Sequence, residues 1–202
     1  MNPFVKVMVV FFTTCGVLAC TPVTKLTETW KAPNYGGGQI EKVLVIAIAK
    51  QAGKRNLFEG EFVKLFNDYG IAAHPSAAIL PKDTKINREA VRAAIAGAGI
   101  DSVFVMKLIE VKEEEVYTPP QMNYSAHGYM GHMMNPMPDT FMPGYYSMLV
   151  NVKLETTLYE TAKGELVWSA VSETYNPESA DDLLNSYKKT IMKDLKKNGF
   201  IN

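Results

Sequence analysis

The sequence predicts a single domain of the α/β (α+β) class, folded as a two-layer or three-layer sandwich. Three observations predict it. Apolar runs of strand length alternate with amphipathic helical stretches from residue 40 to 111, a half-exposed hairpin follows from about 148 to 170, and an amphipathic helix ends the chain. The order is therefore βαβαβ, a long loop, an antiparallel hairpin and a C-terminal helix. A length of 202 residues fits one such domain.

The first half of the domain predicts parallel strands joined by helices. Lys42–Ala49 is a continuous apolar run, which is typical of a strand covered on both faces. The other elements follow in order: a helix over 54–69 that stops at Gly70, a short strand over 71–74, a helix capped by Asn87, and a strand over 101–111. Such alternation requires right-handed helical crossovers.

The second half predicts an antiparallel hairpin with one exposed face. Met148, Val150, Val152 and Leu154 lie on one face of a strand, and polar residues lie on the other. A tight turn over 162–165 leads to the return strand. The last helix begins near Asn176–Ser179 and buries a stripe made of Leu184, Tyr187, Ile191 and Leu195.

Charge and composition exclude some functions. The chain has 21 basic and 21 acidic residues, so nothing favours a nucleic-acid partner. An apolar content of 47% excludes disorder of the whole chain.

The first 19 residues have the layout of a secretory signal peptide, with Lys6 ahead of an apolar run that is too short for a confident membrane span. This run ends in Val17-Leu18-Ala19-Cys20, which resembles the lipobox of bacterial lipoproteins. The resemblance implies that Cys20 receives the lipid. Cys15 is a poorer candidate because Thr14 precedes it, whereas the motif normally carries a small residue there.

A lipid on Cys20 implies a protein held at a membrane. Several acyl chains give stable anchoring, and Thr21 in place of an inner-membrane retention signal favours the periplasmic face of the outer membrane. Residues 20–39 are rich in proline and glycine and are expected to form a lipidated tether, although an ordered leading strand is the alternative. The domain proper then spans 40–202.

Three segments of the domain resemble a known group. They are EKVLVIAIAKQAGKRNLFEGEFVKLF, AVRAAIAGAGIDSVFVMKL and LYETAKGELVWSAVSETYNP, and they are similar to a family of uncharacterised bacterial lipoproteins. The fold also resembles the small α/β domain at the start of TolB and that of the curli-secretion lipoprotein. The resemblance implies an envelope assembly role and names no ligand.

The segment from about 117 to 147 differs from the rest of the chain. It is rich in proline, tyrosine and methionine, and it is expected to be an irregular loop. Methionine and tyrosine provide adaptable contact surface for a partner. Thioether and imidazole groups also suit copper(I), so His127, His132 and the neighbouring methionines form the alternative hypothesis.

Other polar constellations have simple interpretations. Arg55 and Glu59 are four residues apart and are expected to form a solvated helix pair, with partner binding as the alternative. Glu113–Glu115 are expected to form a solvated strand end, and His74 is interpreted as structural or exposed. No phosphate-binding loop or hydrolase motif occurs in the sequence.

The sequence thus predicts a non-enzymatic, periplasm-facing outer-membrane lipoprotein without a cofactor. Its methionine- and tyrosine-rich loop is expected to contact an unknown envelope protein, and an oligomer is possible. The alternative function is that of a periplasmic copper-binding protein.

Overall fold

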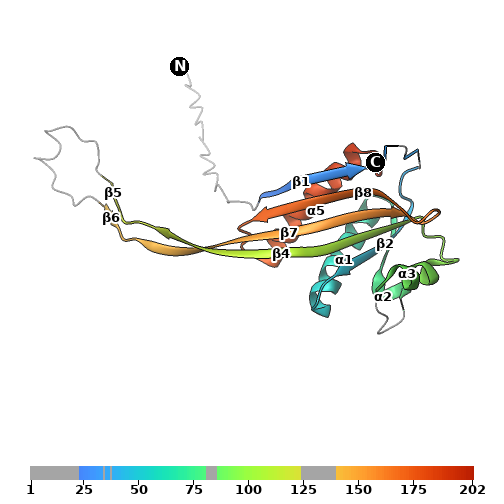
Figure 1. Cartoon of the computed structure of the whole chain (residues 1–202), viewed down its shortest axis with the longest axis horizontal. Coiled ribbons are helices and arrows are strands. Elements are labelled where there is room, and N and C mark those ends of the chain that lie inside the picture. The colour runs from blue at the N-terminus through green and yellow to red at the C-terminus, as the bar shows by residue number, and fades with distance from the viewer. Residues whose placement is uncertain (1–22, 34, 37, 81–85, 124–139) are drawn as a thin grey trace, which may run out of the picture.

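The computed structural model describes residues 23–202 except 34, 37, 81–85 and 124–139. Cys20 and the signal peptide lie outside the described residues. One mixed sheet with the strand order β1-β8-β7-β4-β2-β3 organises the domain (Figure 1). Its strands are β1 (Val23–Lys31), β2 (Lys42–Ile48), β3 (Ala72–Pro75), β4 (Ser102–Thr118), β7 (Tyr145–Glu160) and β8 (Glu165–Tyr175). The helices are α1 (Ala52–Asp68), α2 (Ser76–Ile79), α3 (Arg88–Ile95) and α5 (Ala180–Lys197).

The pairing of the strands confirms the predicted fold class. β2 pairs in parallel with both β3 and β4, as the alternation of strands and helices requires. β4, β7, β8 and β1 then pair antiparallel in that order. The βαβαβ half, the hairpin and the C-terminal helix all occur in the predicted order within one domain.

Strand β1 corrects one expectation. Residues 20–39 are expected to form a tether, with an ordered leading strand as the alternative, and the structure has the strand. Val23–Lys31 pairs with β8 from Val23 opposite Tyr175 to Lys31 opposite Trp168, with a register shift between Leu26 and Glu28. The sequence of β1 lacks a clear alternation of apolar residues because a threonine takes an inward position. Thr24 is buried, and its hydroxyl lies 2.7 Å from that of Thr174. The charged outward side chains of β1 suit an edge strand, since they discourage pairing with another chain.

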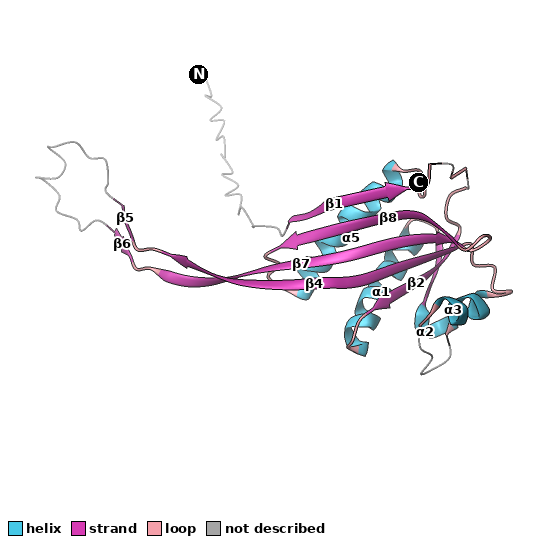
Figure 2. Ribbon diagram, viewed as in Figure 1, coloured by secondary structure: helices cyan, strands magenta, loops and turns pink. Residues whose placement is uncertain are grey.

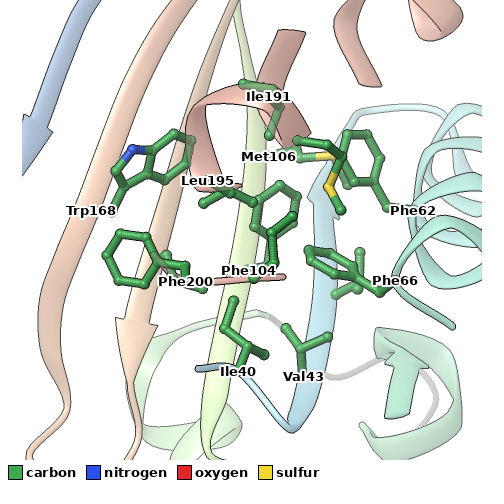
Figure 3. Close-up of a cluster of buried hydrophobic side chains, with 14 of the residues drawn as sticks. Ile40, Val43, Phe62, Phe66, Phe104, Met106, Trp168, Ile191, Leu195 and Phe200 are labelled. Atoms are coloured by element: carbon green, nitrogen blue, oxygen red, sulfur yellow. The ribbon is translucent and has the colours of Figure 1, made fainter. Parts of the chain in front are cut away.

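Helices cover both faces of the sheet. Val43, Val45 and Ala47 of β2 face the larger core, whereas Leu44 and Ile46 face a smaller one. α1 and α5 cover the larger core, and Figure 3 shows its aromatic centre, where the rings of Phe62 and Phe66 lie 5.1 and 5.2 Å from that of Phe104. α3 packs over the smaller core. The domain is therefore a three-layer sandwich along β2 and β4.

An ion pair joins the two helices on the larger core. Glu61 of α1 lies 2.6 Å from Lys188 of α5 and 2.9 Å from Lys64. Hydrogen bonds from these two ammonium groups hold the pKa of Glu61 down to about 2.

Glu59 of α1 is a buried structural carboxylate, and this corrects the expectation of a solvated pair with Arg55. Its side chain is 1% exposed and accepts hydrogen bonds from the Ala47 N–H at 3.0 Å, the Ser76 N–H at 2.9 Å and the Ser76 hydroxyl at 2.7 Å. No ion pair between Arg55 and Glu59 occurs in the described chain. The carboxylate instead ties α1 to the end of β2 and the start of α2.

Replacing Glu59 by alanine should therefore destabilise the domain by about 3 kcal/mol, because two buried backbone N–H groups lose a charged acceptor. Urea unfolding of the purified chain measures this loss. The matched control is Asn56→Ala at an exposed position of the same helix, which should change the free energy of unfolding by less than about 0.5 kcal/mol. Equal effects of the two substitutions would contradict the role given to Glu59.

Candidate functional site

The most distinctive surface is an arm made by the far ends of β4 and β7, which we define as residues 113–123 and 140–150. β8 ends at Tyr175 opposite Asn151, so β4 from Glu113 and β7 up to Val150 pair with each other beyond the rest of the sheet. Two short strands, β5 (Gln121–Asn123) and β6 (Thr140–Met142), pair at its far end. Figure 2 shows the arm projecting away from all the helices.

The arm corrects the expectation of an irregular loop over 117–147. Tyr117 and Thr118 lie in β4, Gln121–Asn123 and Thr140–Met142 form β5 and β6, and β7 already begins at Tyr145. The prolines permit this because Pro119 and Pro120 fall between β4 and β5, and Pro143 falls between β6 and β7. These prolines interrupt the two-stranded ribbon at one point on each strand, and the strands pair on both sides of the interruption.

A tyrosine pair and a glycine hold the arm together near these breaks. Tyr117 and Tyr146 are opposite each other in the ladder, with ring centroids 4.8 Å apart. A Cβ atom at Gly144 would lie 2.5 Å from the Tyr117 hydroxyl and 2.9 Å from Pro120. Only glycine therefore lets the chain approach the tyrosine ring so closely. Sequence reasoning missed these roles, although the alternation through Tyr146 and Met148 pointed to a longer strand.

An apolar row on β7 runs out of the core and along the arm. Leu154 and Val152 are 4% and 7% exposed, whereas Met148 and Tyr146, further along the same face, are 55% and 68% exposed. On β4, Leu108 and Val111 lie opposite Leu154 and Val152 and are 44% and 47% exposed. The alternation of apolar residues that forms the core thus continues along β7, but nothing in the described chain covers the outer end of the row.

The arm also carries negative charge. Glu113 and Glu115 stand opposite Val150 and Met148 on the face of the apolar row, and Glu114 lies on the other face, 3.4 Å from Lys112. All three glutamates are exposed, as predicted, but they lie within the ladder and not at a strand end. The arm therefore presents an exposed apolar row beside carboxylates, a composition suited to contact with another macromolecule.

The copper hypothesis falls on residues that the structure does not describe. His127, His132 and four methionines lie within 124–139. Among the described residues, no group of three His, Cys, Asp or Glu side chains could hold a metal ion. His74 lies in β3 opposite Leu44 and is half-buried. No helix of the described part of the chain is long and apolar enough to cross a membrane.

Comparisons with known proteins found likenesses of fold. No family model and no curated protein matches the sequence. Among solved structures, a PelC dodecamer from Paraburkholderia phytofirmans is similar at 13% identity with a TM-score of 0.45, covering 86% of this chain and 95% of that chain. Lipoprotein GNA1162 from Neisseria meningitidis is similar at 12% identity with a TM-score of 0.44, covering 78% of this chain and 99% of that chain.

Gly144→Val should loosen the arm while leaving the domain intact, because the added side chain displaces Tyr117. Amide hydrogen exchange over 113–118 and 145–150 should become faster, and the melting temperature should change by less than about 2 °C. Gly38→Val, at a position with open space around it, is the control and should leave exchange in the arm unchanged. Unchanged exchange in Gly144→Val would contradict the assigned packing.

Proposed function

We propose that this chain is a non-enzymatic lipoprotein, anchored through lipid on Cys20 to the periplasmic face of the outer membrane, and that its arm contacts another envelope protein. The observation that carries the proposal is the apolar row that leaves the core and continues, exposed, along the arm. Soluble domains seldom leave such a row uncovered unless it meets a partner.

The geometry of the arm supports a contact role. A ribbon of two strands without a third strand or a helix beside it is marginally stable, yet the arm keeps an aromatic pair and a close glycine contact near its breaks. A partner that covers Met148 and Tyr146 would remove apolar surface from water and fix the arm. The neighbouring Glu113 and Glu115 would favour a basic rim on that partner.

The position of the first described strand determines how close an anchor on Cys20 would hold the domain. Val23 is the third residue after Cys20 and already pairs with β8. A lipidated Cys20 would therefore leave only two residues between the lipid-bearing residue and β1. Such an arrangement would hold the domain close to the membrane in place of the long tether that was expected.

Cys20→Ala should release the protein from membranes, because the acyl chains supply the binding energy. Fractionation of the cells that make the protein, followed by immunoblotting, measures the distribution. The wild-type chain should sediment with the outer membrane and the variant should not, whereas Cys15→Ala should behave as wild type. Retention of Cys20→Ala in the outer-membrane fraction would overturn the anchor.

The contact role predicts a partner that depends on the arm. After chemical cross-linking of intact cells and affinity purification, the wild-type chain should recover a specific envelope protein. The double variant Tyr146→Ser and Met148→Ser should lose it. Trp30→Ser, which removes an exposed aromatic side chain from β1, should keep it. The contact role is wrong if the arm variant keeps the partner or if no protein is recovered with the wild type.

A further inference from the structure

A cleft lies between α3 and the face of the sheet opposite α1 and α5. Its volume is about 520 Å³, within the range of small-molecule sites. Apolar side chains from β2 and β4 form the floor, and those of α3 and of a residue two positions before it form the roof. They are Ile46, Ile48, Val103 and Val105 below, and Ile86, Val91 and Ile95 above.

The cleft is an incompletely filled apolar interface. α3 is strongly amphipathic, and its apolar residues Val91 and Ile95 pack against the smaller core, yet none of its residues is buried. Ile48 on the floor is 46% exposed.

Charged groups line the same cleft. The lining includes Arg88 and Arg92 of α3 and Glu160 at the end of β7. Arg88 donates a hydrogen bond to the Gly164 carbonyl at 3.0 Å, which leaves further N–H donors of its guanidinium group available. Arg92 has no hydrogen bond or ion pair within the described chain. Two positive charges and one negative charge give the lining a net charge of +1.

We propose that this cleft binds a single-chain anionic amphiphile, with its hydrocarbon chain between α3 and the sheet and its carboxylate at Arg92. The apolar floor and roof match the hydrocarbon chain, and the net positive charge matches a head group with one negative charge. A cationic head group would leave Arg92 without its counter-ion. This site is independent of the arm, so either can fail without the other.

The test uses the full chain purified in an uncharged maltoside detergent and titrated with radiolabelled dodecanoate. The wild-type chain should bind one equivalent saturably. Arg92→Gln should weaken the affinity about tenfold, because a charge-assisted hydrogen bond is lost. Lys189→Gln, which removes an exposed positive charge from α5, should leave the affinity unchanged. The detergent carries no carboxylate and its background is common to all three proteins, so the differences report on the cleft.

Two further experiments test the chemistry of the ligand and the position of its chain. Dodecyltrimethylammonium, which keeps the chain and reverses the charge, should not compete with dodecanoate, and neither should acetate, which lacks the chain. Val105→Trp fills the floor of the cleft and should reduce the bound equivalents. Circular dichroism checks that each variant is folded.

Three outcomes would overturn the proposal. They are an absence of saturable dodecanoate binding, an affinity of Arg92→Gln equal to that of the wild type, or displacement of dodecanoate by the cationic amphiphile. If dodecanoate does not bind but Arg92→Gln lowers the sedimentation coefficient, the cleft is instead a contact between copies of this chain.

Discussion

The antiparallel ladder between β4 and β7 joins the two halves of the domain. β4 is the last strand of the parallel half, with β2 on one side, and β7 is the first strand of the hairpin half, with β8 on the other. The ladder continues from Ser102 opposite Glu160 to Thr118 opposite Tyr145, well past the ends of both neighbours. The sheet order, the placing of the helices and the existence of the arm all depend on this one pairing.

The same side-chain alternation has opposite consequences along that ladder. Near Leu158 and Leu154, α1 and α5 cover the apolar face and the row becomes core. Past Val150 the helices end and the identical pattern becomes exposed surface. Burial of apolar area is favourable wherever it occurs, so the arm can gain from a partner what the inner strand gains from the helices. This view explains why apolar residues persist where the fold no longer uses them.

Much of the fold followed from the sequence because its strongest signals were periodic. The buried run of β2, the helix α1, the buried stripe of α5 and the alternation of β7 from Met148 are confirmed. The sequence gives β1 only as the alternative to a tether, because Thr24 takes an inward position, where hydrogen bonding to Thr174 replaces apolar packing. The burial and hydrogen bonding of Glu59 could not be predicted either, because its partners Ala47 and Ser76 come near it only in the tertiary fold. The arm was hidden by prolines, whose position between paired segments no local rule reveals.

The central claim is that the outer part of the β4–β7 ladder is a contact surface. Its most direct test places a photoreactive amino acid at Met148 in the living cell and, as a control, at Lys25 on the exposed side of β1. Illumination should produce one discrete cross-linked species from position 148 and none from position 25. If position 148 gives no cross-link, or if both positions give the same species, the arm is not the surface that meets the partner.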